Sequence, residues 1–196
     1  FEGSFAFFFV TFVAVHVPLL LFGVTGRVES VLIAVAVAFL TTCFEAISVR
    51  GLDNLFVPFG CWYALDNYLS RPEENHAERL AFLGGAAALA FALRRGGFMT
   101  RTGAVGLLLA GYAAWSMGDW PWLAPMGAAA LVVWASSLAI RKHPDFVPMG
   151  LSSFFQLVVV SVAVLFAFNE TDPPRHFLFV PFLAAVAAGA AVGVVQ

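Results

Sequence analysis

Three acidic residues, Glu2, Glu45 and Asp53, lie at the edges of long apolar segments. Ionisable groups near apolar segments are costly in a membrane, so each one is a candidate for function. Successive membrane-spanning helices alternate in direction. The same side of the membrane therefore holds the start of the first segment, the end of the second and the start of the third. Three carboxylates there would supply the hard oxygen ligands of Mg²⁺, which usually bridges to substrate phosphates. The spacing therefore predicts one metal site formed by Glu2, Glu45 and Asp53.

Each of these carboxylates also has a simpler interpretation. Asp53 and its neighbour Asn54 can cap the start of a helix, where exposed N–H groups also favour anions. Glu2 and Glu45 can be charges at the membrane interface. Asp66 lies toward the other end of the segment that Asp53 opens, so we leave it out of the predicted cluster.

The four histidines are scattered along the chain. His16 lies within the first apolar segment, where a neutral imidazole can ligate haem or chlorophyll. We favour a packed histidine that is hydrogen-bonded to a neighbouring helix. The other three are expected to be solvated loop residues: His76, His143 and His176.

The composition fixes the class of protein that must position these residues. Hydrophobic residues make up 61% of the 196 residues and charged residues 11%, against about 45–50% and about 25% in soluble proteins. The mean hydropathy is +0.90. A net charge of −2 leaves no basic field to attract nucleic acid. We therefore expect an integral membrane protein with no nucleic-acid partner.

The apolar pattern predicts an all-α, polytopic fold with about eight transmembrane helices, or six to seven if a weak segment is re-entrant. Each span needs about 20 mostly apolar residues. The expected spans are 5–25, 28–48, 54–70, 79–95, 102–118, 123–140, 147–168 and 177–195. Glycine, proline and charge mark the breaks between them at 70–78, 96–97, 118–122, 141–144 and 171–174.

The distribution of Lys and Arg among the short loops predicts the orientation. With eight spans, the side that holds the N-terminus carries six basic residues and the opposite side four. The six are Arg50, Arg94, Arg95, Arg101, Arg141 and Lys142, and the four are Arg27, Arg71, Arg79 and Arg175. We expect a cytoplasmic N-terminus in a bacterial-type inner membrane, with residues 71–78 on the other side.

Two motifs carry a resemblance to a known family. Glu2-Gly3-Ser4 precedes a Phe-rich run, and Glu45 is followed by Asp53-Asn54-Leu55-Phe56-Val57-Pro58. Together they resemble the Glu-Gly-Ser and Asp-Asn-Leu-x-Val-Pro elements of the CTP-dependent lipid kinases. That family includes dolichol kinase and phytol kinase and is related to phosphatidate cytidylyltransferase. The resemblance covers about residues 1–60.

The resemblance implies transfer of the CTP γ-phosphoryl group to a membrane prenyl alcohol or related lipid. It implies Mg²⁺ and CTP as the bound groups, and a kinase-like three-helix segment at 1–70 followed by a helical membrane region at 71–196. Its implied catalytic residues are Asp53 and Glu45. The implied nucleotide- or substrate-binding residues are Ser4, Asn54 and Pro58, and the implied metal ligands are Glu2, Glu45 and Asp53.

Alternatives stay open at this point. In the family a Gly-rich basic segment precedes Glu-Gly-Ser, whereas this sequence starts at Phe1. A truncated kinase, a phosphatidate cytidylyltransferase and a non-enzymatic subunit of a larger membrane complex all fit. Gly189 and Gly193 have the spacing that lets two helices approach closely, either within the chain or between chains.

Overall fold

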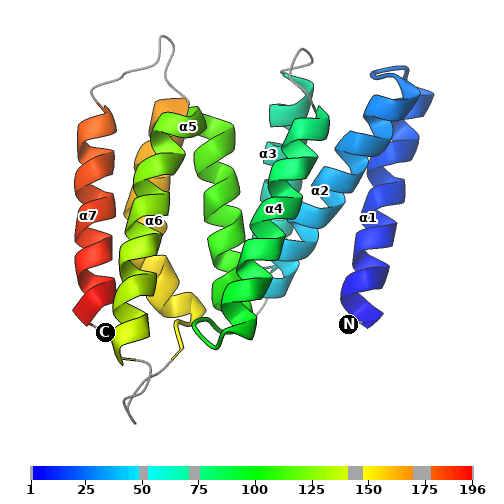
Figure 1. Ribbon diagram of the computed structural model, residues 1–196. Coiled ribbons are helices and arrows are strands. Elements are labelled where there is room, and N and C mark those ends of the chain that lie inside the picture. Colours follow the sequence, from blue (N-terminus) through cyan, green and yellow to red (C-terminus); the bar gives the residue numbers. More distant parts are fainter. Residues whose placement is uncertain (1, 49–52, 71–75, 141–147, 170–177, 196) are drawn as a thin grey trace. The chain divides into compact units, whose positions relative to one another are not determined.

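The structure is a computed structural model that describes residues 2–48, 53–70, 76–140, 148–169 and 178–195 (Figure 1). These residues form an all-α fold. Its helices are α1 (Glu2–Leu21), α2 (Arg27–Ile47), α3 (Asp53–Leu69), α4 (His76–Arg95), α5 (Arg101–Ile140), α6 (Leu151–Asn169) and α7 (Phe179–Val195). The chain divides into two compact units: unit one is Phe1–Gly85 and unit two is Ala86–Gln196. Unit one thus contains the whole of the predicted 1–70 segment.

The helices lie where the apolar pattern predicts them, so the all-α prediction is confirmed. Within the part of the chain that the structure describes, three helical stretches are long and apolar enough to cross a membrane: Gly3–Leu21, Arg27–Ile47 and Trp120–Ala139. Two shorter apolar stretches accompany them, Val160–Asn169 and Phe179–Ala191.

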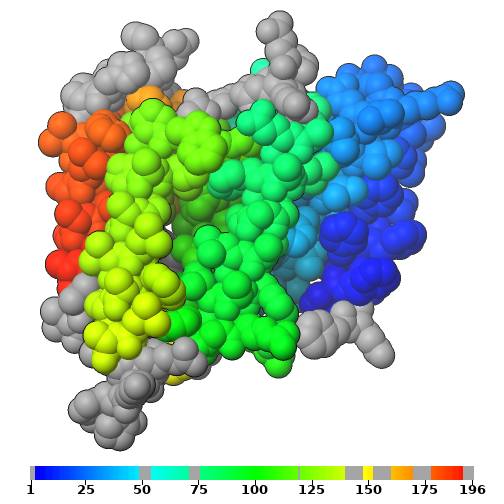
Figure 2. Space-filling view, viewed as in Figure 1, coloured from blue at the N-terminus to red at the C-terminus, as the bar shows by residue number. Residues whose placement is uncertain are grey.

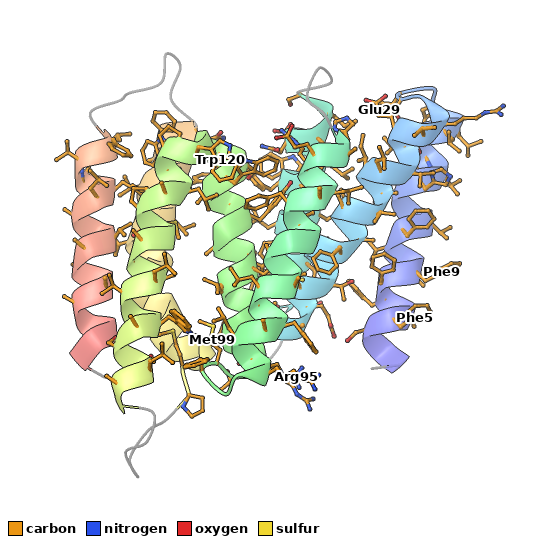
Figure 3. All side chains as sticks on the ribbon, viewed as in Figure 1. Phe5, Phe9, Glu29, Arg95, Met99 and Trp120 are labelled. Carbon is orange, nitrogen blue, oxygen red and sulfur yellow. The ribbon has the colours of Figure 1, made fainter. Side chains whose placement is uncertain are left out.

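Helix α2 is the centre of unit one, because both α1 and α3 pack against it (Figure 1). Its buried side chains are mostly small, including Ala34, Ala36 and Ala38. Small side chains let helix backbones approach closely, as is common between membrane helices. The space-filling view shows the side chains of α1 and α2 in contact (Figure 2). On the opposite side of α1, Phe5 and Phe9 point away from α2, and Phe5 is 74% exposed (Figure 3).

Two glycines end helices in the left-handed conformation that glycine adopts at least cost. After α1, Gly23 has a φ of 63°, and the Val24 N–H donates to the Leu19 carbonyl at 3.1 Å. After α4, Gly97 has a φ of 78°, and the Phe98 N–H donates to the Leu93 carbonyl at 3.1 Å. Both are Schellman ends, and the second confirms the break predicted at 96–97.

At the break predicted at residues 118–122 the chain reverses direction, but helical backbone continues through it, so that α5 spans 40 residues. A straight helix of that length would measure about 60 Å. Instead, the rings of Phe98 and Trp134 lie 6.0 Å apart although they precede and follow the predicted break. The helix therefore folds back on itself, and Figure 1 shows the bend. Pro121 and Pro125 lie inside the helix, where proline removes a backbone donor and promotes a kink.

An aromatic cluster in unit two holds this bend. Trp122 is buried, and its ring lies 4.4 Å from Phe168 of α6 and 4.6 Å from Phe182 of α7. By contrast, Trp120 lies at the bend and is exposed (Figure 3). The contacts of Trp122 come from side chains that the chain supplies 46 and 60 residues later, which explains why the local sequence alone suggested a loop.

Unit two also contains the predicted small-residue pair of α7. Gly189 is buried. The burial of Gly193 is not among the described features. The helix contact expected there stays a prediction.

Candidate functional site

The residues predicted to form the site lie at three helix ends of unit one. Glu2 and Ser4 are in the first turn of α1, Glu45 is in the last turn of α2, and Asp53 opens α3. Because α1 and α3 both pack against α2, these three ends lie at the same end of the unit (Figure 1). We call it the carboxylate end. The side chains of Glu2 and Asp53 lie outside the described part, so the predicted three-carboxylate cluster stays a prediction.

Glu45 is the member of this set whose surroundings are described. Its side chain is partly buried, and it makes no hydrogen bond or ion pair with any described residue. A negative charge in the last turn of a helix also opposes the helix dipole, and no basic residue accompanies it in that turn. Within the described residues, no hydrogen bond, ion pair or favourable helix dipole therefore accounts for a carboxylate at this position.

The helices are closely packed next to the carboxylate end. A Cβ atom added at Gly60 of α3 would overlap the ring of Phe44, the residue before Glu45. The end of α2 is closed by Ser48, whose hydroxyl donates to the Phe44 carbonyl at 2.7 Å. Glu45 thus lies at a helix end that packs closely against α3.

The remaining predicted residues differ in exposure. Ser4 is partly buried, whereas Asn54 and Pro58 on α3 are exposed. Pro58 lies inside α3, and it leaves the carbonyl four residues earlier without its helical donor. That carbonyl belongs to Asn54, so a free backbone acceptor is expected next to the predicted nucleotide-binding side chain.

A search of the described side chains finds no group of three or more His, Cys, Asp or Glu residues that could hold a metal ion. Glu2 and Asp53 are not among those side chains. Glu45 is therefore the one described member of the predicted metal-ligand set.

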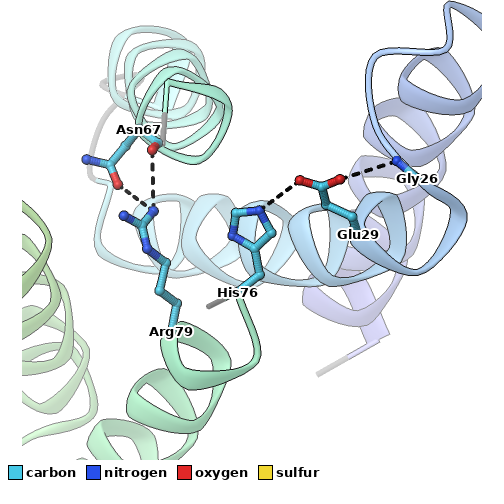
Figure 4. A network of polar contacts seen from close by, with 5 residues as sticks. All are labelled: Gly26, Glu29, Asn67, His76 and Arg79. Carbon is cyan, nitrogen blue, oxygen red and sulfur yellow. Dashed lines mark hydrogen bonds and ion pairs between the residues drawn. The ribbon is translucent and has the colours of Figure 1, made fainter. Parts of the chain in front are cut away.

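A second polar group, which sequence reasoning missed, lies at the opposite end of unit one (Figure 4). We call it the polar junction, and it consists of Glu29, Asn67, Tyr68, His76 and Arg79. The His76 Nε2 atom lies 3.1 Å from Glu29 Oε1. An ionised carboxylate only accepts hydrogen bonds, so Nε2 is the donor. Arg79 Nη1 donates to the side-chain and backbone oxygens of Asn67 at 2.8 and 3.3 Å.

The polar junction contacts three helix ends: the start of α2, the end of α3 and the start of α4. The second oxygen of Glu29 accepts the Gly26 N–H at 3.3 Å, which caps the start of α2. Arg79 bonds to one of the last carbonyls of α3, where a positive charge also suits the helix dipole. Both Arg79 and His76 belong to the first turn of α4. Arg79 also lies over the Tyr68 ring, with 4.9 Å between its guanidinium carbon and the ring centroid.

The expectation that His76 is a solvated loop residue is wrong. It is the first residue of α4 and only 6% exposed, and Arg79 is 2% exposed. The partner of His76 is 47 residues away in sequence, so no local pattern reveals the contact. The available signal was the spacing of His76 and Arg79, which places both on one face of a helix that begins beside an apolar span.

The expectation for His16 is confirmed, because it is hydrogen-bonded to a neighbouring helix. Its Nδ1 atom lies 2.7 Å from the hydroxyl of Ser30, a fully buried residue of α2. The ring also stacks on Phe12, with 5.3 Å between centroids. These contacts give His16 a structural role in joining α1 to α2.

With this geometry established, comparison with known proteins adds no identification: no family model, curated protein or solved structure matches the chain. The resemblance to the CTP-dependent lipid kinases therefore depends on the motifs at 2–4 and 45–58 and on where the fold carries them.

Proposed function

We propose that this protein phosphorylates a membrane prenyl alcohol or related lipid with CTP as the phosphoryl donor. One observation supports the proposal most. The two motifs lie far apart in sequence, yet the helix ends that bear them are at the same end of unit one (Figure 1). Phosphoryl transfer depends on positioning and charge neutralisation more than on covalent chemistry, so charged side chains on packed helix ends suit it.

The proposed site also fits a bound Mg²⁺ by its donor chemistry. Glu2, Glu45 and Asp53 offer carboxylate oxygens, and Glu45 has no competing partner among the described residues. When bound, Mg²⁺ would neutralise negative charge on the CTP phosphates.

The chain's own residues would orient the two substrates and accept the proton. In the proposed step, the lipid hydroxyl oxygen forms a bond to the γ-phosphorus while the bond from that phosphorus to the CDP oxygen breaks. The hydroxyl proton passes to the carboxylate of Asp53 or Glu45. Ser4, Asn54 and the backbone near Pro58 would contact the nucleotide or the lipid head.

The proposed reaction requires a particular arrangement in the membrane. We propose that each arm of the folded α5 crosses the bilayer, which gives eight crossings from the helices of Figure 1. The carboxylate end then faces the cytoplasm, where CTP is found. The lipid alcohol reaches the same site from the bilayer, which α1 faces with exposed side chains such as Phe5 and Phe9.

A transfer assay with a single substitution tests the proposal. Membranes containing the full-length gene product are incubated with γ-labelled CTP and phytol, a polyprenol or diacylglycerol. Wild type should label a lipid, and Asp53→Asn should abolish labelling, since the neutral amide would hold Mg²⁺ more weakly and could not accept the hydroxyl proton. The matched control is Asp66→Asn, an exposed position toward the other end of α3, which should retain activity.

Two results would contradict the proposal in different ways. Near-normal labelling by Asp53→Asn would remove Asp53 from the site. No labelling by wild type with any of these alcohols would favour a non-enzymatic subunit of a larger complex, whereas release of pyrophosphate from CTP with phosphatidate would indicate a cytidylyltransferase.

A further inference from the structure

Helix α4 carries arginines near both of its ends, and their surroundings differ. Arg79 in the first turn is buried and bonds to Asn67. In the last turn, Arg95 is exposed and Arg94 is partly exposed. Neither of these two makes a hydrogen bond or an ion pair with any other residue that the structure describes. Contacts within the described part of the chain therefore do not account for their charges.

A short turn brings a third arginine close to this pair in the chain. Only residues 96–100 separate the end of α4 from Arg101, the exposed first residue of α5. Hydrogen bonds hold this turn in place. The Thr100 N–H donates to the Met149 carbonyl at 3.0 Å, and the Thr100 hydroxyl accepts the Gly103 N–H at 3.2 Å. The two helix ends that bear the arginines are thus joined by an ordered connection.

We call Arg94, Arg95 and Arg101 the basic corner. A cation suits the end of a helix, so Arg94 and Arg95 favour α4, whereas Arg101 opposes the dipole at the start of α5. Residues 91–104 and 148–151, which form the described part of this region, include no Asp or Glu. Like charges gathered in this way repel one another. An anion from outside the chain would offset that repulsion.

The surface of α4 next to the basic corner is apolar. Phe91 is 57% exposed, and Ala88 is also exposed. Ala88, Phe91 and Arg95 follow one another at intervals of three and four residues, which places them on one face of the helix. We call Ala88 and Phe91 the apolar strip. Figure 3 shows the Arg95 side chain beyond it, pointing away from the helix. A phospholipid has the same order of chemistry, an apolar chain that ends in a phosphate.

We propose that the basic corner and the apolar strip together bind an anionic phospholipid. The arginines hold its phosphate, because a guanidinium forms charge-assisted hydrogen bonds to phosphate oxygens. One acyl chain lies along Phe91, which a free phosphate or nucleotide would leave uncovered. The count of Lys and Arg residues assigns the corner to the cytoplasmic side, where anionic lipids give the leaflet its negative potential. The inference does not depend on the reaction proposed above, because all of these residues belong to unit two.

Lipid binding to the full chain in detergent, followed by native mass spectrometry, tests the proposal. Phosphatidylglycerol and phosphatidylcholine with identical acyl chains are titrated separately, and the ratio of their dissociation constants gives the preference for the anionic lipid. Wild type should prefer phosphatidylglycerol at least tenfold. Each arginine near a membrane surface contributes about fivefold, so Arg95→Gln should lower the preference about fivefold. Replacing all three arginines by glutamine should abolish it. Equal binding of both lipids to wild type, or an unchanged preference in the triple variant, would overturn the proposal.

The matched control is Arg27→Gln, which removes an exposed arginine from the first turn of α2 in unit one. It should leave the preference unchanged. A fall equal to that of Arg95→Gln would show that net charge sets the preference, which would overturn the assignment to the basic corner. Thermal unfolding of each variant in detergent checks that the fold is kept.

Two further measurements distinguish a lipid from a free anion. Phe91→Ala should weaken the binding of both lipids by a similar factor, because it removes contact with the acyl chain, and unchanged affinities would overturn the role of the apolar strip. Replacing ammonium acetate by ammonium phosphate at the same ionic strength should not displace phosphatidylglycerol. Displacement would show that the corner binds free phosphate and would overturn the assignment to a lipid.

Discussion

The two ends of unit one use charge in opposite ways. At the polar junction, Arg79 and His76 are buried, and each has a partner on another helix. At the carboxylate end, Glu45 has no partner among the described residues and opposes the dipole of its own helix. The contacts of the described residues explain the first arrangement by the stability of the fold, and they do not explain the second. Groups that break a local stability rule are expected at functional sites, which is why we assign the chemistry to the carboxylate end.

The largest expected effect tests this contrast at Glu45. Glu45→Gln should lower the rate of phosphoryl transfer by about 100-fold or more, as removal of a charge from a preorganised site does. Its free energy of unfolding should stay the same or rise by about 0.3 kcal/mol, because a negative charge leaves a helix C-terminus. Transfer kinetics and thermal unfolding in detergent measure the two quantities.

Glu78→Gln is the control for this change, since Glu78 is exposed in the first turn of α4. The Glu78→Gln variant should keep the wild-type rate of phosphoryl transfer. If Glu45→Gln instead lowers stability and spares the rate, Glu45 belongs with the structural charges and the contrast between the two ends is lost.

The second test removes a charge from the polar junction. Arg79→Met keeps most of the apolar stem but leaves the Asn67 oxygens without their donor. The free energy of unfolding should fall by about 1–3 kcal/mol, the usual cost of leaving buried polar groups unpaired. Transfer per folded molecule should change little, because the junction lies at the far end of the unit.

Arg95→Met provides the comparison for Arg79, since it removes an exposed arginine from the last turn of the same helix. It should destabilise the protein less than Arg79→Met. Equal losses would mean that the buried contacts of Arg79 contribute nothing beyond its charge.

The sequence predicted the helices well because their signal is local. Stretches of about 20 apolar residues separated by glycine, proline and charge define them, and the structure places helices there. Gly97 ends α4 as predicted, since a left-handed helix end needs glycine and little else. The contact of His16 followed from the cost of an unpaired polar group in an apolar segment.

What the sequence did not predict depends on partners distant along the chain. The burial of His76 requires Glu29 and Tyr68 from two other helices. The turn of α5 carries glycine and proline, which correctly indicate a reversal, but they do not indicate that Trp122 in this turn packs against α6 and α7. Predicting either feature would have required knowledge of which helices are neighbours.

The smallest expected effect concerns the contact between His76 and Glu29, which a double-mutant cycle isolates. His76→Phe keeps a ring beside Tyr68 but removes the donor, and Glu29→Gln keeps the cap on Gly26 but removes the charge. The Glu29 side chain is 32% exposed, so water screens the interaction. We expect a coupling free energy of about 0.5–1 kcal/mol between the two changes. Thermal unfolding of the wild type, both single variants and the double variant gives this value. A coupling of zero would mean that the contact between His76 and Glu29 adds nothing to the stability of the junction, and the contacts of Arg79 with Asn67 and Tyr68 would remain.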